Sequence, residues 1–452
     1  LPTKAHILSL FLFPVSTNYV MKMINCFIPF LSLPQARQTV RALGLCDRIK
    51  NIYLLATEKI PDEVEGCEML MIDSPASTAT FRTIALHADT AYTLLYTKYT
   101  AFEPGQFAFE RLLAIAGDTN AGMLYADRYL LKNGNSQQAP VIDYQKGSLR
   151  DDFDFGSLLF FRSSVLKQAV RAMDADYRFA GLYDLRLRVS ELAELVHVNE
   201  YLYSEVETDI RKSGEKLFDY VDPKNRAVQI EMEAVCTAYL KRVGGYLAPD
   251  FEPVTFDAGG FEQEASVIIP VRNRIRTIED AIRSVLAQKT TFRFNLIIVD
   301  NHSTDGTSEA IGKYTADGRV VHLVPERSDL GIGGCWNVGV HHPACGKFAV
   351  QLDSDDVYSG PDTLQKIVDA FYEQNCAMVV GTYRMTDFKM NEIPPGIIDH
   401  REWTLENGRN NALRINGLGA PRAFYTPVLR RINIPNTSSG EDYALGLRVS
   451  RT

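Results

Sequence analysis

The sequence lacks the features that mark membrane-spanning, disulfide-stabilised and nucleic-acid-coating proteins. No segment approaches the roughly 20 consecutive apolar residues of a membrane-spanning helix, and the most apolar one, 7–15, is interrupted by Pro14. The 7 cysteines are irregularly spaced and form no C-x-x-C pair, which argues against a zinc site or a disulfide framework and favours a reducing compartment. Acidic residues (56) outnumber basic ones (48), so the net charge is −8 and non-specific binding to nucleic acid is not expected.

The overall amino-acid composition is that of a folded globular protein. Hydrophobic residues make up 46% of the chain and charged residues 23%, whereas a disordered chain is poor in apolar residues and rich in charge. The 30 glycines and 20 prolines are too few for a fibrous or low-complexity protein. At 452 residues the chain has room for about two to four domains.

Five segments of the first half recur in the same order in the second half. Convergence on the composition of a strand could explain one such match, but not five in order, and the last pair shares the pattern L-x-L-R-V-S. We therefore predict a tandem duplication. The matched pairs are 24–30 with 266–271, 51–56 with 295–300, 92–96 with 348–352, 120–129 with 375–383, and 181–190 with 441–450.

Each half alternates short apolar runs with segments of helical periodicity, which predicts an α/β fold. We expect each domain to be a mostly parallel sheet flanked by helices. Because two methionines, Met21 and Met23, precede the first convincing strand, the residues before them are expected to be extraneous. The second copy ends two residues after its L-x-L-R-V-S match, so we expect it to be truncated. The predicted segments are 1–20 (extension), 21–250 (first domain with a C-terminal helical segment), 251–264 (linker) and 265–452 (second domain).

An acidic motif, D-S-D-D at 353–356, directly follows a predicted strand of the second copy. In an open α/β sheet, ligands bind outside the carboxyl ends of the strands. Two carboxylates one residue apart can hold Mg²⁺ or Mn²⁺, which commonly bind through one or two carboxylates and the phosphates of a substrate. The alternative is a solvated turn in which Asp362 caps the next helix. The preceding buried strand favours the cation site.

Three further motifs of the second copy allow both a functional and a structural interpretation. Asp300 ends a strand and could bind a base or ribose, or form an Asx turn before a helix. The glycines of 331–334, with Asn337, could admit a phosphate or allow tight helix packing, and their spacing is not that of a dinucleotide fingerprint. Glu441 and Asp442 begin a helical segment, where acids often only complement the helix dipole.

Together these motifs resemble the family 2 glycosyltransferases, which have the GT-A fold. The resemblance covers about 265–451, and the motifs are P-V-R-N at 270–273, V-D-N-x-S-T-D-G-T at 299–307, L-D-S-D-D at 352–356 and E-D-Y at 441–443. It implies transfer of a sugar from a nucleotide-diphosphate donor to an acceptor hydroxyl, with inversion at the anomeric carbon. The sequence departs from the family pattern at two positions. Asn301 stands where an aspartate is common, and Trp336 stands where a basic residue is frequent.

The resemblance also implies roles for individual residues. Asp355 is the ligand of Mn²⁺ or Mg²⁺ on the diphosphate, Asp353 faces the ribose or the metal, and the donor is expected to be linked to UDP. Asp442 is the base that deprotonates the acceptor, with Glu441 beside it. The residues expected to contact the donor are Pro270, Val271, Asn273, Asp300, Asn301, Asn337, Asp353 and Ser354.

The first copy has none of these carboxylates at the aligned positions. Residues 97–100 (T-K-Y-T) stand in place of 353–356, Gly181 and Leu182 in place of the E-D pair, and Ala56 in place of Asp300. We therefore predict that the first domain binds neither metal nor donor, with metal-free binding through Lys98 as the alternative.

The predicted function is glycosyl transfer in the synthesis of a surface polysaccharide or another glycoconjugate. We expect a glycan or glycolipid acceptor and a cytoplasmic location, with peripheral association at the inner face of the membrane as an alternative. Two other classes compete: a non-catalytic scaffold that binds nucleotide sugars, and a nucleotidyltransferase. The latter would need a glycine-rich basic loop after the first strand of the second copy, but 270–276 contains no glycine.

Overall fold

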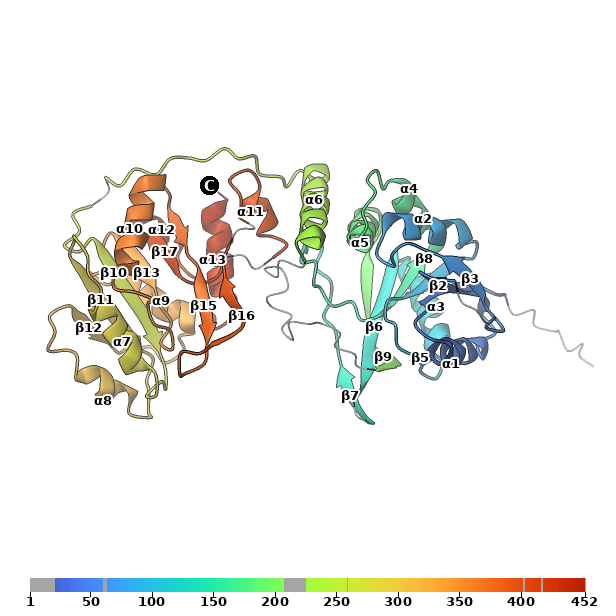
Figure 1. Ribbon diagram of the computed structural model, residues 1–452, viewed down its shortest axis with the longest axis horizontal. Coiled ribbons are helices and arrows are strands. Elements are labelled where there is room, and N and C mark those ends of the chain that lie inside the picture. Colours follow the sequence, from blue (N-terminus) through green and yellow to red (C-terminus); the bar gives the residue numbers. More distant parts are fainter. Residues whose placement is uncertain are drawn as a thin grey trace, which may run out of the picture. The chain divides into compact units, whose positions relative to one another are not determined.

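The computed structural model describes residues 21–59, 63–132, 134–206, 225–257, 259–400, 403–415 and 418–451 (Figure 1). The chain divides into two compact units, one comprising Leu1–Lys146 and Asp154–Thr208 and the other Gly147–Phe153 and Asp209–Thr452. The predicted extension at 1–20 lies outside the described residues. The division assigns the helical segment before residue 250 to the second unit, so the boundary expected near that residue stays a prediction.

The first unit contains one mixed sheet, with strand order β3-β2-β1-β4-β8-β6-β9-β5 and β7 paired to β6 among the described residues. Strands β1 to β4 run parallel, while β8 is antiparallel to both β4 and β6. Its strands are β1 (Ile24–Pro29), β2 (Ile49–Ala56), β3 (Glu68–Met71), β4 (Tyr92–Tyr96), β5 (Phe102–Pro104), β6 (Met123–Lys132), β7 (Asn135–Ala139), β8 (Leu158–Arg162) and β9 (Leu195–Val206). Its helices are α1 (Leu33–Gly44), α2 (Thr78–His87), α3 (Ala108–Thr119), α4 (Ser163–Arg171) and α5 (Gly181–Leu192).

The second unit contains a sheet of order β12-β11-β10-β13-β17-β14 and a separate pair, β15-β16. Strands β10 to β13 run parallel, and β17 is antiparallel to β13 and β14. Its strands are β10 (Ala265–Val271), β11 (Phe294–Asp300), β12 (Val320–Leu323), β13 (Phe348–Gln351), β14 (Met378–Val380), β15 (Tyr383–Thr386), β16 (Glu392–Ile398) and β17 (Arg422–Tyr425). Its helices are α6 (Arg226–Val243), α7 (Ile278–Leu286), α8 (Thr307–Gly312), α9 (Ile332–His341), α10 (Thr363–Gln374), α11 (Gly408–Asn411), α12 (Thr426–Ile432) and α13 (Glu441–Ser450).

The two sheets share an order of strands. The run β3-β2-β1-β4-β8-β6 of the first sheet has the same sequence of neighbours and directions as β12-β11-β10-β13-β17-β14 of the second. The expectation of mostly parallel sheets is wrong for the first unit, where antiparallel pairs are as frequent as parallel ones. A strand that is covered on both faces is an apolar run whether it pairs in parallel or antiparallel, so the hydrophobic pattern could not distinguish the two kinds of pairing.

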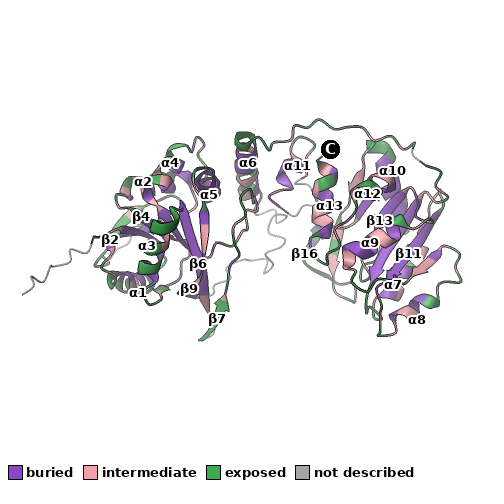
Figure 2. Cartoon of the chain, turned by 180° about the vertical axis from the view of Figure 1, so that it is seen from behind, coloured by how far each residue is buried: buried purple, intermediate pink, exposed green. Residues whose placement is uncertain are grey.

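The second sheet is buried on both faces, as alternate residues of its central strand show. On one face, Val267 and Ile269 of β10 pack with Phe371 of α10. On the other, Ile268 packs with Trp336 of α9 and with α13. Figure 2 shows these strands buried beneath helices whose outer sides are exposed. Trp336 is only 2% exposed, so this departure from the family pattern serves the core.

Local sequence signals explain the helix that follows the central strand. Helix α7 buries Ile278, Ile282 and Val285, which recur at helical spacing. Its first turn carries Glu279 and Asp280, which complement the positive end of the helix dipole. Because β10 and α7 are both anchored in the core, the loop between them is held at the carboxyl edge of the sheet, and its polar residues lie there.

The glycine-rich segment at the start of α9 allows close packing. A Cβ atom on Gly333 would lie 1.9 Å from the carbonyl oxygen of Pro435. Both polar atoms of the Asn337 amide are also occupied by the backbone of Ile434, with Nδ2 donating to the carbonyl at 2.7 Å and Oδ1 accepting from the amide at 2.9 Å. These contacts favour the packing interpretation of the glycines over the phosphate-binding one.

We expect Gly333→Ala to destabilise the second unit by about 1–3 kcal/mol, because the added methyl group must displace backbone atoms. Gly312→Ala is the matched control, since a Cβ there meets nothing within 4 Å, and it should be neutral or stabilising by up to about 1 kcal/mol. Urea unfolding followed by tryptophan fluorescence measures this unit, because the chain's 2 tryptophans, Trp336 and Trp403, both lie in it. Equal effects of the two substitutions would contradict this explanation.

Candidate functional site

The candidate site lies at the carboxyl ends of β10, β11 and β13. Strand β10 pairs in parallel with β11, where Val271 lies opposite Asp300, and with β13, where Ile268 lies opposite Gln351. The order of strands reverses at β10, because β11 and β12 continue to one side and β13 lies on the other. Open α/β sheets bind ligands at such a switch point. The fold thus brings Val271, Asp300 and the acidic motif after β13 to one edge.

Asp300 is fully buried at this edge. Its carboxylate accepts hydrogen bonds from the backbone amide of Ser303, at 3.0 Å, and from the hydroxyl of Ser308, and Nε2 of His322 lies 3.5 Å away. Burial raises the pKa of the Asp300 carboxyl, but these hydrogen bonds and the nearby histidine lower it more, so the pKa lies below its usual value. Asp300 is therefore a carboxylate that organises its own loop, as the Asx-turn alternative expected, and that can still accept further hydrogen bonds.

Two asparagines join the loops that follow β10 and β11. Asn273, at a φ of +54°, accepts a hydrogen bond from the backbone amide of Thr304 at 2.8 Å. Asn301 donates through Nδ2 to the carbonyl of Leu330 at 2.8 Å. Its Oδ1 is buried and has no hydrogen-bond partner in the described part of the chain. The side chain of Asn273 thus has a bracing role, whereas Asn301 keeps one acceptor for a ligand.

The acidic motif forms a crowded group of carboxylates. Burial raises the pKa of Asp353, and Asp355 and Asp442 raise it further, while Arg422 opposes them. Burial, together with the charges of Asp353 and Asp355, raises the pKa of Asp356 to about 6. The side chain of Asp355 is 49% exposed and lies 3.7 Å from Nε of Arg274. The negative charges of these carboxylates repel one another, and a nearby positive charge reduces this repulsion.

The acidic motif fits a divalent cation only as part of a shared site. Among the described residues, no group of three or more His, Cys, Asp or Glu side chains is arranged to hold a metal ion. Asp353 and Asp355 could supply one or two carboxylates, and Mg²⁺ and Mn²⁺ commonly complete such a set with substrate phosphates and water. Burial raises the pKa of Asp353 and Asp356 most, and repulsion from neighbouring carboxylates adds to the rise; a bound cation would relieve this repulsion.

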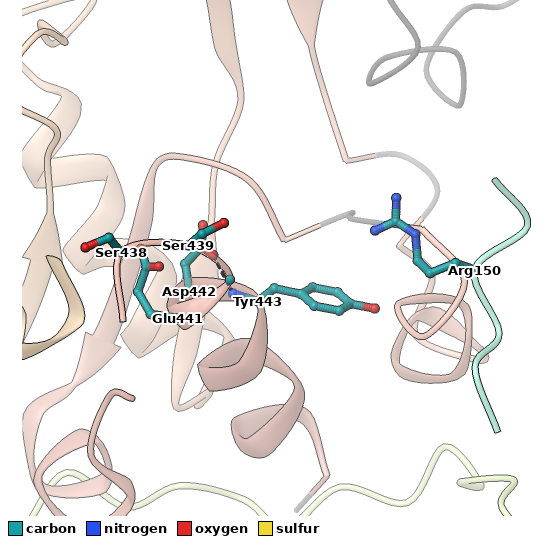
Figure 3. Close-up of a pocket in the computed structure, with 7 residues that line it drawn as sticks. Arg150, Ser438, Ser439, Glu441, Asp442 and Tyr443 are labelled. Atoms are coloured by element: carbon teal, nitrogen blue, oxygen red, sulfur yellow. Dashed lines mark hydrogen bonds between the residues drawn. The ribbon is translucent and has the colours of Figure 1, made fainter. Parts of the chain in front are cut away.

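The E-D pair begins α13, after Gly440 in a left-handed conformation with a φ of +76°. Glu441 is 7% exposed, burial raises its pKa, and its Oε2 has no hydrogen-bond partner in the described structure. Oδ2 of Asp442 lies 2.8 Å from Nη1 of Arg422, and its Oδ1 accepts from the amide of Tyr443 at 2.7 Å. Both acids line a depression of about 400 Å³ (Figure 3). The other lining residues are Arg150, Ser438, Ser439, Gly440 and Tyr443.

The sequence analysis missed Arg422, which connects these groups. It begins β17 and is 8% exposed. Its Nε donates to Oε1 of Gln351 at 2.8 Å, and its Nη1 contacts both Asp442 and the carbonyl of Leu418. One sequence signal could have indicated its role: an arginine begins the apolar strand R-A-F-Y. A buried arginine requires an acidic or carbonyl partner, so this pattern predicts such a partner nearby.

The raised pKa of Asp356 predicts a dependence of stability on pH. Below about pH 4 this carboxyl is protonated in both the folded and the unfolded chain, so it has no effect. Between about pH 4 and its folded pKa of about 6, ionisation favours the unfolded chain, and the loss of stability persists above that range. We expect Asp356→Asn to match the wild type near pH 4 and to be more stable at pH 7.5. The gain should stay below about 1 kcal/mol, because the residue keeps an exposed surface from which water screens its charge, even though crowding by neighbouring atoms raises its pKa.

Urea unfolding of both proteins without divalent cations measures this difference. Adding Mn²⁺ at pH 7.5 should reduce it, because a bound cation would offset the charge of Asp356, which only the wild type carries. A difference of the same size at both pH values would show that Asp356 acts through packing and not through its charge.

The comparison with protein families concerns the second unit. The model of the family described as Glycosyl transferase family 2 matches residues 266–431. A Rickettsia felis protein described as an uncharacterized glycosyltransferase is 38% identical over 192 residues, which are 42% of this chain and 30% of that protein. TuaG of Bacillus subtilis, provisionally described as a teichuronic acid biosynthesis glycosyltransferase, is 33% identical over 120 residues, 26% of this chain and 46% of that protein. The chain thus spans less than half the length of these curated relatives.

Solved structures give a more distant likeness. Staphylococcus aureus TarS 1-349 in complex with UDP-GlcNAc is 24% identical over 41% of this chain and 53% of that chain, with a TM-score of 0.34. The mannosyltransferase PcManGT of Pyrobaculum calidifontis, in complex with GDP-Man and Mn²⁺, is 18% identical over 50% of this chain and 61% of that chain, with a TM-score of 0.33. These scores are too low to support conclusions about ligands. The family match and the named homologues identify a glycosyltransferase family 2 domain at 266–431 and support a transferase.

Proposed function

We propose that the second unit transfers a sugar from a nucleotide-diphosphate donor to an acceptor hydroxyl, with inversion at the anomeric carbon. One observation carries the proposal: the acidic motif after β13 and Asp442 of α13 lie close enough to affect each other's charge. The buried guanidinium group of Arg422 pairs with Asp442 and also acts on Asp353. These residues lie at the switch point of the sheet, where α/β folds bind their ligands. We also propose that each unit has the GT-A fold.

The donor occupies the edge formed by β10, β11 and β13 in this proposal. The nucleoside, expected to be uridine, lies against Pro270, Val271 and Asp300. It donates one hydrogen bond to Oδ1 of Asn301, which has no partner in the described part of the chain. A Mn²⁺ or Mg²⁺ ion held by Asp353 and Asp355 with the diphosphate would offset the charge that develops on the leaving group. The remaining donor contact is assigned to Ser354. The amide of Asn337 is occupied at both polar atoms, which leaves it a structural role, whereas Asn273 uses its Oδ1 to brace the loop and keeps its Nδ2 for the proposed donor contact.

Asp442 acts as the general base on the other side of the sugar. It removes the proton from the acceptor hydroxyl as that oxygen attacks the anomeric carbon. The bond from this carbon to the diphosphate breaks, and the diphosphate leaves with the electron pair. One direct displacement inverts the configuration. The depression in front of Asp442 and Glu441 supports an acceptor site there, with the unpartnered Oε2 of Glu441 free to accept from a sugar hydroxyl.

The first unit is proposed to be a duplicate that has lost this chemistry. The shared order of strands supports the duplication. Beyond the end of β4, a buried network occupies the first unit: Arg128 pairs with Glu205 at 3.0 Å, and Glu205 also accepts from the hydroxyl of Ser157. The backbone amide of Thr97 donates to the carbonyl of Ser157 at 2.8 Å. Because these charges satisfy one another, they support the absence of a metal or donor site in this unit.

The acceptor is proposed to be a glycan or glycolipid of a surface polysaccharide or another glycoconjugate. None of the helices in the described part of the chain is long and apolar enough to cross a membrane. The cytoplasmic location and the association with the inner face of the membrane stay predictions. No observation favours the scaffold or the nucleotidyltransferase over the transferase.

A screen of nucleotide sugars on the full chain tests the proposed function. The release of nucleoside diphosphate and the transfer of sugar are measured with Mn²⁺, with Mg²⁺ and with EDTA. We expect one class of donor, linked to UDP, to be turned over only when a divalent cation is present. Absence of turnover with every donor, or equal turnover in EDTA, would refute the proposed reaction.

A further inference from the structure

Arg422 lies where the donor and acceptor parts of the candidate site meet. Its Nε donates to Gln351, the last residue of β13 and two positions before Asp353. Its Nη1 lies 2.8 Å from Oδ2 of Asp442 in the first turn of α13 and 3.1 Å from the carbonyl oxygen of Leu418. One rigid guanidinium group therefore spans the end of the strand that carries the acidic motif and the helix that carries the proposed base.

The surroundings of Arg422 are unusual for a residue that only braces a strand. Its side chain is 9% exposed and that of Asp442 28% exposed, so water screens their interaction little. The charge of Arg422 also acts on Asp353, Asp356 and Glu441, opposing the repulsion among the carboxylates. Arg274 also lies beside the cluster, but it is 52% exposed and lies 3.7 Å from Asp355. Arg422 is thus the buried counter-charge of the group.

We propose that Arg422 is a positioning residue of the transfer reaction: it holds the Asp442 carboxylate toward the acceptor and away from the cation at Asp353 and Asp355. This inference rests on the proposed function. Without the guanidinium, the Asp442 carboxylate would lose the ion pair that holds it away from Asp353 and Asp355, the residues that would hold a divalent ion, and it would be drawn toward that charge. A displacement of about 1 Å in a reacting group can reduce catalysis about 100-fold. Asp442 then acts as a base because Arg422 keeps it out of the metal site.

A purely structural role makes a different prediction. If Arg422 only joins β17 to β13, its loss should lower stability and should reduce turnover by the same factor whether or not Asp442 can act as a base. A positioning role makes the two residues dependent on each other. Arg430 offers a matched control, since it lies on the neighbouring helix α12 and donates to the carbonyl oxygens of Val340 and His342, at 2.9 and 3.3 Å.

The first test is a double-mutant cycle in the full chain. We expect Arg422→Gln to lower kcat about 10- to 100-fold and to leave the KM for the donor within about threefold. In an Asp442→Asn background the same substitution should reduce kcat by less than about threefold, because the base is already lost. Arg422→Lys should recover part of the activity, and Arg430→Gln should leave kcat unchanged. An undiminished effect in the Asp442→Asn background, or an unchanged kcat of Arg422→Gln, would overturn the proposal.

The second test does not need a substrate. Loss of the buried counter-charge makes the acidic cluster more negative, so we expect Arg422→Gln to bind Mn²⁺ severalfold more tightly than the wild type. Arg430→Gln should bind Mn²⁺ as the wild type does. An unchanged or weaker affinity of Arg422→Gln, measured by calorimetry on a variant whose circular dichroism is unaltered, would overturn the inference. If the wild type turns over no donor, the proposed function and the positioning role fail together, whereas tighter Mn²⁺ binding by Arg422→Gln would still show that the charge of Arg422 opposes the cation site.

Discussion

Asp442→Asn is expected to reduce sugar transfer by about 10²- to 10⁴-fold, the range that a general base contributes. The asparagine keeps the shape of the side chain and one acceptor oxygen. Its NH2 group cannot accept from Arg422 in place of Oδ2, and the amide cannot take the proton of the acceptor hydroxyl. Binding of UDP and Mn²⁺ should stay within about threefold of the wild type, since this residue does not contact the donor in the proposed mechanism. Steady-state kinetics with the donor from the screen, together with calorimetric titration, measures both quantities.

Asp362→Asn is a suitable control for this substitution. Asp362 lies in the same unit, is 57% exposed and pairs with Lys366 at 2.8 Å on the surface of α10. Removing its charge should leave both transfer and binding within about twofold. If Asp442→Asn kept more than half of the wild-type rate, the base would have to be assigned elsewhere, with Glu441 as the next residue to test.

Asp355→Ala is expected to abolish measurable transfer, with a loss of at least about 100-fold. The side chain is proposed to hold the cation that offsets charge on the leaving diphosphate, an effect comparable to removing an electrostatic stabiliser of the transition state. Unlike the loss of the base, this substitution should also weaken the binding of UDP. The dependence of the rate on Mn²⁺ concentration should shift to higher concentrations or disappear.

The neighbouring acid provides the contrast for this prediction. Asp356→Asn lies one position further along the same motif, and its carboxylate is not assigned to the cation. We expect it to retain transfer within about tenfold and to keep its Mn²⁺ dependence. Equal losses for Asp355→Ala and Asp356→Asn would mean that the motif contributes general negative charge and no specific ligand.

The sequence was most informative where a signal is local. The apolar runs that became β10, β11 and β13 could be located because a buried parallel strand contains little but apolar residues, and each is followed by polar residues. The acids at 353–356 therefore lie at the predicted edge. The direction of β8 and β17 could not be predicted, since their pairing depends on partners far along the chain.

Contacts between distant residues account for what the sequence did not indicate. Arg422 lies 71 positions from Gln351, and no local pattern links them. The same holds for Asn337, whose predicted donor contact was based on its place near glycines, while its amide is bound to Ile434, 97 positions away. In the first unit, Arg128 and Glu205 are 77 positions apart. The sequence does not show this pairing; it shows only that the acidic motifs of the second half are missing from the first half.

The proposed function places one donor site in the second unit, at the edge of β10, β11 and β13, and none in the first unit. Calorimetric titration of the full chain with UDP in the presence of Mn²⁺ tests this claim most directly, with Asp355→Ala titrated alongside. We predict that the wild type binds one UDP per chain and that Asp355→Ala loses this binding. Two UDP per chain, binding that survives unchanged in Asp355→Ala, or no binding by the wild type would contradict the account.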